Sequence, residues 1–307
     1  MQGLRLLLPR ESRDSEELMR EMFRQSKAFF SLDPDDKMAV KADKNNRGYT
    51  PMHDETLDPS NQAKGDTKEG YNIFREIDAH GEEATKPLRG PNPWPSEDLL
   101  PEQGIWGFKA RIPTMKDYFD RMLDLGVRLS GLLAAGMGLD SSFFDGCFSE
   151  SLSALRLLHY SSEVSDAKKG VLGTGAHSDD GLTTMLATGS LHPADEVPGL
   201  QVMLDGEWLD VPPRPGAFVC NLGDMLQRWT NDNLRSTTHR VFNKLGRERY
   251  SIPFFFIPNF DTEVVSVPQF CSEENPAKYP PVTSGVYLLE KFVQTFQDFK
   301  KGDQAEK

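Results

Sequence analysis

Hydrophobic positions recur with two different periods along the chain, which predicts helices near both ends and strands between them. Apolar residues at mixed three-, four- and seven-residue spacings predict an amphipathic helix over residues 16–30. Three- and four-residue steps predict a longer helix over 112–133, and a similar pattern predicts a last one over 284–300. We interpret the stripe of the long helix as core packing.

After residue 152 the pattern changes to short apolar and β-branched runs that alternate with Gly, Pro and Asp turns. Such runs favour a sandwich or closed barrel over alternating strands and helices. The predicted strands are 152–160, 181–188, 199–204, 207–211, 216–221, 236–243, 249–257 and 262–267. Residues 41–101, rich in Pro, Gly, Asn and charge, are expected to form a long loop, either functional or a solvated connector.

This organisation predicts one compact unit. We expect an N-terminal helical and loop region at 1–150, a β core at 151–270, and a C-terminal helix and tail at 271–307. The helices are expected to pack outside the β core.

The composition narrows the class of protein. The 307 residues carry a net charge of −12, with 37% hydrophobic and 10% aromatic residues, which is typical of a globular protein. An acidic chain without a long basic run makes a nucleic-acid partner unlikely. No apolar run is long enough to span a membrane. Three cysteines without a pairing pattern predict a reducing, cytoplasmic location, whereas the oligomeric state stays open.

A His-x-Asp motif is the first candidate for chemistry. His177 and Asp179 are two positions apart, so an extended strand places both side chains on one face. Alone, the motif equally fits a turn carboxylate beside a surface histidine. A second histidine, His239, lies in another predicted strand. Two histidines and one carboxylate are typical of non-haem iron(II) oxygenases, and zinc is the alternative metal.

An Arg-x-Ser motif follows the second histidine. Arg249 and Ser251 share one face of a predicted strand, where a guanidinium and a hydroxyl can bind a carboxylate. Alone, Arg249 equally fits a surface salt bridge. The order His-x-Asp, distant His, then Arg-x-Ser is much more specific than any of its parts.

With these motifs, the sequence resembles the iron(II)- and 2-oxoglutarate-dependent dioxygenases of the isopenicillin N synthase-like family, from its first predicted helix to its last. It is similar in particular to a small-molecule branch that includes thymine dioxygenases and relatives linked to nicotinate breakdown. The segments that carry this similarity are Arg47-Gly48-Tyr49, Lys68-Glu69-Gly70-Tyr71, Asn92-Pro93-Trp94-Pro95, Leu155-Arg156-Leu157-Leu158-His159-Tyr160, Asn221-Leu222-Gly223-Asp224-Met225-Leu226, Arg228-Trp229 and Arg249-Tyr250-Ser251-Ile252-Pro253.

The resemblance implies a mainly β fold: a double-stranded β-helix, or jelly roll, with supporting helices. It implies three catalytic iron ligands, His177, Asp179 and His239. It also implies 2-oxoglutarate as co-substrate, with O2 as oxidant. The far carboxylate of 2-oxoglutarate is expected to contact Arg249, Ser251 and Tyr160.

Strand parity extends this interpretation to the substrate. Arg156 shares a strand face with Tyr160, and Phe255 shares one with Ser251, so both should face the barrel interior. The resemblance implies that Arg156 and Phe255 contact the substrate, and the pair suits a flat polar ring.

Two further residues complete the candidate set for the substrate. Asp180 is either a second carboxylate beside the metal, favouring an amine-bearing substrate, or a turn residue of an Asp-Gly pair. Tyr71 lies in the long predicted loop and is expected to close over the pocket.

The resemblance therefore implies hydroxylation or demethylation of a small, N-heterocyclic compound, with release of succinate and CO2. One alternative is an oxidase of the same fold that does not use 2-oxoglutarate. Another is an inactive metal-binding module, because relatives usually place a strand, a helix and a second strand before the point that matches Gly3-Leu4. The N-terminal part is thus expected to be truncated.

Overall fold

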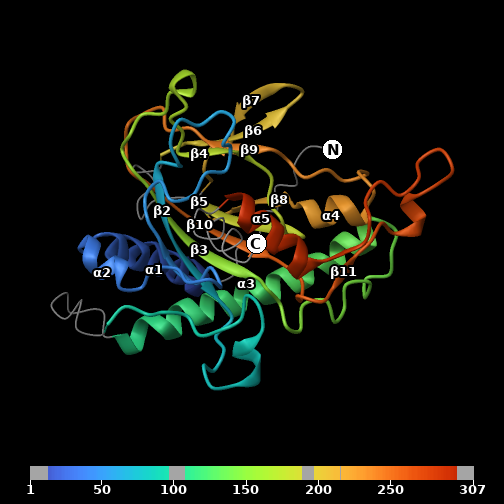
Figure 1. Cartoon of the computed structure of the whole chain (residues 1–307), viewed down its shortest axis with the longest axis horizontal. Helices are drawn as coiled ribbons and strands as arrows, with labels where there is room; N and C mark the ends of the chain where they lie inside the picture. Colours follow the sequence, from blue (N-terminus) through green and yellow to red (C-terminus); the bar gives the residue numbers. More distant parts are fainter. Residues whose placement is uncertain (1–12, 97–107, 189–196, 215, 296–307) are drawn as a thin grey trace, which may run out of the picture.

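Two β-sheets enclose the centre of the molecule. The computed structural model describes residues 13–96, 108–188, 197–214 and 216–295 (Figure 1). One sheet has the strand order β1-β2-β3-β10-β5-β8 and the other the order β4-β9-β6-β7, while β11 and β12 form a separate two-stranded sheet. The strands are β1 (Gly48–Thr50), β2 (Lys68–Phe74), β3 (Ala154–Tyr160), β4 (Thr174–His177), β5 (Thr183–Thr188), β6 (Leu200–Leu204), β7 (Glu207–Asp210), β8 (Phe218–Leu222), β9 (His239–Val241), β10 (Arg249–Phe256), β11 (Glu263–Val264) and β12 (Val282–Thr283). This is the predicted double-stranded β-helix.

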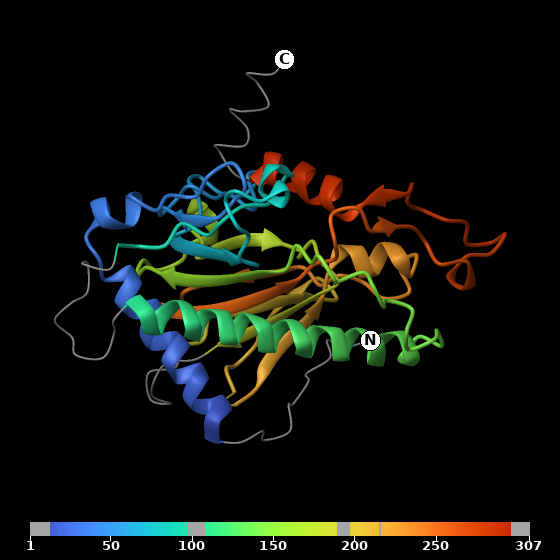
Figure 2. The same ribbon diagram turned by 90° about the horizontal axis from the view of Figure 1, so that it is seen from below.

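The two long helices of the described chain cover the outer face of the six-stranded sheet. The helices are α1 (Arg13–Phe30), α2 (Pro34–Met38), α3 (Phe108–Gly136), α4 (Asp224–Trp229) and α5 (Ser284–Thr295). The helices α1 and α3 cross beneath the strands and both contact β10 (Figure 2). Within the described part of the chain, every helix is too short or too polar to cross a bilayer.

Strand β10 separates the helical layer from the interior of the barrel. Its residues Ile252, Phe254 and Phe256 are fully buried on the side of the helices. The ring of Phe254 meets the ring of Phe119 from α3 edge to face, with centroids 5.3 Å apart. The alternate residues, among them Arg249 and Ser251, therefore face the barrel interior.

The predicted elements agree with the structure in most places. The predicted helices over 16–30 and 112–133 correspond to α1 and α3, and that over 284–300 to α5, with residues 296–300 outside the described range. Each of the eight predicted strands overlaps one of the strands β3 and β5–β11.

The prediction of a long loop over residues 41–101 was wrong. This segment contributes β1 and β2 to the large sheet, and β2 is buried at every position. The hydrophobic pattern does not predict β2, because Lys68, Glu69 and Asn72 are polar residues. In the structure each of these side chains is nevertheless buried and has a polar partner.

The contact between α3 and β10 gives a first prediction. A Cβ at Gly126 would lie 2.5 Å from Cδ2 of Phe256, whose ring is stacked on Phe148 with centroids 3.9 Å apart and has no room to retreat. We expect Gly126→Ala to lower the free energy of unfolding by about 1–3 kcal/mol, measured by urea denaturation.

Gly136 on the same helix provides the matched control. Apart from the neighbouring backbone of the helix itself, no atom of the described residues lies within 4 Å of a Cβ placed there. Gly136→Ala should therefore not destabilise the protein, since alanine has the higher helix propensity. Equal stabilities of the two variants would contradict the close packing of α3 on β10.

Candidate active site

The register of β4 against β9 brings two histidines together. The two strands are antiparallel, and His177 lies directly opposite His239. The imidazole centroids are 4.2 Å apart. Strand pairing therefore places side chains from distant parts of the sequence side by side, as predicted.

Local backbone contacts orient both imidazoles. Nδ1 of His177 lies 2.9 Å from the carbonyl oxygen of Gly175, and Nδ1 of His239 lies 3.0 Å from that of Thr237. Because a carbonyl can only accept, each Nδ1 carries the proton and donates it. Each Nε2 then presents its lone pair away from the strand.

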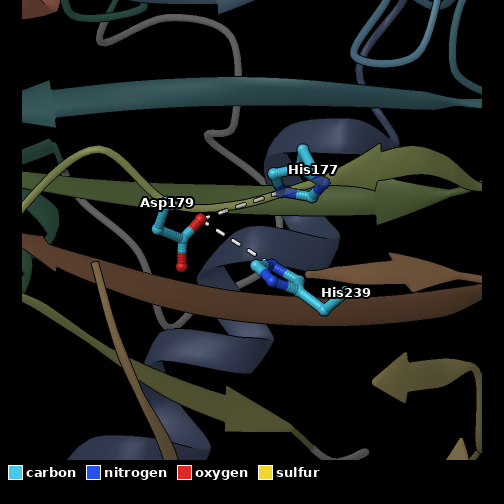
Figure 3. A group of neighbouring side chains, drawn as sticks. All are labelled: His177, Asp179 and His239. Carbon is cyan, nitrogen blue, oxygen red and sulfur yellow. Dashed lines mark ion pairs between the residues drawn. The ribbon is translucent and has the colours of Figure 1, made fainter. Parts of the chain in front are cut away.

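Both Nε2 atoms point at one carboxylate (Figure 3). Oδ1 of Asp179 lies 3.7 Å from Nε2 of His177 and 3.7 Å from Nε2 of His239. Its other oxygen, Oδ2, accepts a 2.6 Å hydrogen bond from Nδ2 of Asn221 on β8. Potential ligand atoms of the three residues lie within 4.8 Å of one another.

The turn that carries Asp179 is held by backbone contacts. The amide of Asp224, the first residue of α4, donates a 2.7 Å hydrogen bond to the carbonyl of Asp179. Gly223, which precedes it, approaches so closely that a Cβ would lie 2.2 Å from the carbonyl oxygen of Gly181. Only glycine fits there, which explains the Gly223-Asp224 pair in the sequence.

The protonation states suit a divalent cation. Burial, together with the neighbouring His239, lowers the pKa of His177 to about 3, so its imidazole is neutral at pH 7. Burial opposes ionisation of Asp179, but His239, His177 and the hydrogen bonds from Thr184 and Asn221 keep its pKa below the usual value. Two imidazoles and one carboxylate on one side of a common point fit iron(II) and leave other coordination positions open.

A cavity extends from these three residues into the barrel. Both sheets line it, with alternate residues of each strand facing inwards. The lining includes Lys68, Arg156, Leu158, Tyr160, His177, Asp179, Thr184, Asn221, His239, Arg249, Ser251, Pro253 and Phe255. The strand faces predicted for β3 and β10 are thus the faces that the structure turns inwards.

The Arg-x-Ser motif places buried donors in this cavity. Arg249 and Ser251 are 7% and 1% exposed, and within the described residues neither Nη1 of Arg249 nor Oγ of Ser251 has a hydrogen-bond partner. Tyr160 lies opposite Arg249 in the sheet, with the guanidinium 4.9 Å from the centre of its ring. Buried donors without acceptors are costly unless a ligand satisfies them, and a carboxylate would do so.

Two residues predicted for the substrate lie in the same cavity, and two do not. Arg156 and Phe255 line it, whereas Tyr71 and Asp180 do not. Tyr71 is on the opposite face of β2, in the hydrophobic core against Phe29, and its hydroxyl donates to the carbonyl of Pro93. The carboxylate of Asp180 lies 3.9 Å from Nζ of Lys291 on α5.

Sequence reasoning missed several side chains around the site. Asn221 orients Asp179, and its place next to the Gly223-Asp224 pair was the available signal. Lys68 lines the cavity from a strand that the sequence did not predict. Glu55 lies behind the wall and pairs with both Lys68 and Arg156, a contact that has no local signature.

Two family models match the sequence. Residues 152–258 match the 2OG-Fe(II) oxygenase superfamily, and residues 12–97 match a family described as non-haem dioxygenase in morphine synthesis, N-terminal. Kihadalactone A synthase LFS of Citrus sinensis is 34% identical, over 95% of this chain and 84% of its own length. A 2-oxoglutarate-Fe(II) type oxidoreductase, hxnY of Emericella nidulans, is 38% identical over 84% of this chain and 72% of its own length.

Solved structures share the fold over nearly the whole chain. The full-length thymine 7-hydroxylase of Neurospora crassa in complex with alpha-KG (2-oxoglutarate) superimposes with a TM-score of 0.75 at 31% identity, covering 94% of this chain and 84% of that one. The same protein with alpha-KG and thymine gives a TM-score of 0.76 at 30% identity, covering 93% and 85%.

The hydrogen bond to Asp179 gives a second prediction. Asn221→Ala removes the donor that fixes Oδ2 and should weaken the affinity for divalent metal about 10- to 100-fold. Anaerobic calorimetry with iron(II) measures this. Asn233→Ala, in an exposed turn where the amide donates to the carbonyl of Thr230, should bind iron(II) like the unmodified protein. Equal affinities of the two variants would show that Asn221 does not orient the carboxylate.

Proposed function

The chain belongs to the 2OG-Fe(II) oxygenase superfamily, whose members use iron(II), 2-oxoglutarate and O2, and from this premise we propose that it hydroxylates or demethylates a small, N-heterocyclic compound. The strongest support is one cavity that joins a His-Asp-His cluster to a buried arginine and serine with unsatisfied donors. The similarity to a 2-oxoglutarate-Fe(II) type oxidoreductase and to a structure in complex with alpha-KG supports oxidation that depends on 2-oxoglutarate.

In this proposal His177, Asp179 and His239 would hold the iron. When bound, iron with 2-oxoglutarate and O2 supplies the oxidising power, and the co-substrate leaves as succinate and CO2. The chain's own contribution is to fix the donors. The Gly175 and Thr237 carbonyls orient the imidazoles, and Asn221 orients the carboxylate.

Arg249, Ser251 and Tyr160 would bind the far carboxylate of 2-oxoglutarate. A guanidinium offers parallel donors to two oxygens, and a serine hydroxyl adds another. Leu158 occupies the inward position between Arg156 and Tyr160, so it closes that side of the co-substrate site with an apolar surface.

Arg156 and Phe255 would contact the substrate. They lie on the inward faces of β3 and β10, where Arg156 can donate hydrogen bonds and Phe255 can stack on a ring. The thymine complex of the Neurospora crassa relative contains a flat, polar heterocycle, which supports a small ring as the substrate here.

We further propose that the N-terminal region 1–150, the core 151–270 and the C-terminal part 271–307 work as one unit. Strands β1 and β2 of the first region belong to the same sheet as β3 and β10. Lys68 of β2 lines the cavity itself, so the wall of the site depends on the first region.

Loss of a metal ligand gives a third prediction. His239→Ala should weaken iron(II) binding more than the ~100-fold expected for loss of an outer hydrogen bond, because one of three donors disappears. Anaerobic titration with iron(II) measures this. His80→Ala, at an exposed histidine, should bind normally. Retained iron affinity in His239→Ala would rule out the proposed ligand set.

The co-substrate site gives a fourth prediction. Arg249→Gln should weaken 2-oxoglutarate binding about 10- to 100-fold while leaving iron affinity intact, since a charge-assisted hydrogen bond is worth ~1.5–3 kcal/mol. Calorimetry on the iron-loaded, oxygen-free protein tests binding, and succinate release under air tests turnover. Arg247→Gln, at an exposed arginine two residues away, is the control. Succinate release independent of Arg249 would contradict the assignment.

A further inference from the structure

Four charged side chains are buried together in the wall of the cavity. Glu55, Asp66, Lys68 and Arg156 are 5%, 0%, 3% and 8% exposed. Arg156 donates from Nη1 to Oε1 of Glu55 at 3.0 Å, and its Nη2 lies 3.0 Å from Oε2. Nζ of Lys68 lies 2.8 Å from Oε2 of Glu55 and also donates to Asp66. We call these four residues the wall quartet.

The cations of the wall quartet face the candidate site, and the carboxylates lie behind them. Lys68 and Arg156 line the same cavity as the His-Asp-His cluster, whereas Glu55 and Asp66 are not part of its lining. The guanidinium of Arg156 lies against Gly70, where a Cβ would be 3.0 Å from Nε. Glycine at this position thus lets Arg156 lie flat on β2 between Glu55 and the cavity.

Each cation of the wall quartet lies in contact with a carboxylate: Arg156 with Glu55, and Lys68 with both Glu55 and Asp66. Burial opposes the charge on Glu55, but Arg156 and Lys68 hold its pKa well below the usual value. Burial raises the pKa of Asp66, yet both of its oxygens already accept hydrogen bonds. Oδ1 accepts from the amide of Gly175 and from Gln62, and Oδ2 accepts from Lys68. Contact with the Nζ atom of Lys68 opposes the effect of burial on the carboxylate.

The wall quartet sets two carboxylates against two cations, and it is neutral as a unit because each cation has a carboxylate partner. In the loaded site, iron(II) and Arg249 would contribute three positive charges. Asp179 and the two carboxylates of 2-oxoglutarate would contribute three negative charges, so these groups also balance. A charged substrate would enter a cavity lined by buried side chains without a counter-charge, which is strongly unfavourable.

We infer that the substrate is an uncharged polar compound, and that Glu55 sets this specificity by neutralising Arg156. The inference rests on the proposed function, because it takes Arg156 as a substrate contact. Glu55 acts through Arg156 and is a positioning residue. It leaves the arginine as a hydrogen-bond donor while cancelling the charge that would otherwise attract an anion.

Three pyridines of one shape and different charge test this inference. Nicotinamide is neutral, nicotinate is an anion, and 3-(aminomethyl)pyridine is a cation at pH 7.5. Calorimetry on the protein loaded with iron(II) and 2-oxoglutarate without oxygen measures binding rather than turnover. The unmodified protein should bind nicotinamide in preference to both ions.

Glu55→Gln should shift this preference towards the anion. Removing one negative charge leaves the wall with an excess positive charge, so the affinity for nicotinate relative to nicotinamide should rise by about tenfold or more. Glu163→Gln, at a surface glutamate that pairs with Lys64, should leave the ratio unchanged. A folded Glu55→Gln protein that gains no affinity for nicotinate overturns the inference.

Two more variants keep the test decisive if Glu55→Gln does not fold. Arg156→Gln reverses the sign and should favour the cationic pyridine. The double variant Glu55→Gln/Arg156→Gln is neutral again and should lose both ionic preferences. A purely structural role would lower the unfolding temperature without moving these ratios, and that result would also overturn the inference.

Failure of this inference and failure of the proposed function give different results. If the unmodified protein binds neither iron(II) nor 2-oxoglutarate, the proposed function fails. If it binds both and the charge preference does not follow Glu55, only the assignment of Glu55 and of a neutral substrate fails.

Discussion

The pairing of β4 with β9 in one particular register is the constraint on which the site depends. His177 opposes His239 only in this register, and a slip by one residue would turn one imidazole to the other face of the sheet. The backbone then fixes each ring through its Nδ1 atom, and a glycine-dependent turn brings Asp179 to both Nε2 atoms. Main-chain hydrogen bonds, together with the side-chain amide of Asn221, thus fix the orientation of these three side chains.

Strand β10 couples this site to the stability of the fold. One face packs Phe254 and Phe256 against α3, and the other presents Arg249, Ser251 and Phe255 to the cavity. Because adjacent residues of one strand serve both layers, a change in the spacing between helix and sheet would also move Arg249 and Ser251, the donors proposed to bind a carboxylate. The close approach at Gly126 is therefore a condition for the geometry of the cavity as much as for core packing.

The sequence was informative where alternation within one strand decides the answer. Once β3 and β10 are recognised, parity alone turns Tyr160, Arg156, Ser251 and Phe255 inwards, and the structure agrees. The expectation that Tyr71 closes over the pocket assumed a loop, in which the direction of a side chain is open. Tyr71 lies instead in the strand β2, where Lys68 and Gly70 hold the inward positions, so alternation turns the tyrosine into the core. The pair of Glu55 with Arg156 joins residues 101 positions apart, and no local pattern encodes such a contact.

Buried ion pairs are weak stabilising devices, because desolvation cancels much of their attraction. The wall quartet is therefore better explained by where it lies than by what it adds to folding. Asp66 accepts a hydrogen bond from the amide of Gly175, and the carbonyl of Gly175 accepts one from Nδ1 of His177. A Cβ on Gly175 would lie 2.7 Å from the amide nitrogen of Asp58, so only glycine lets the preceding loop approach this closely. One residue thus links the charged wall to a proposed metal ligand, and the loop that balances charge in the cavity also supports the strand that would hold the iron.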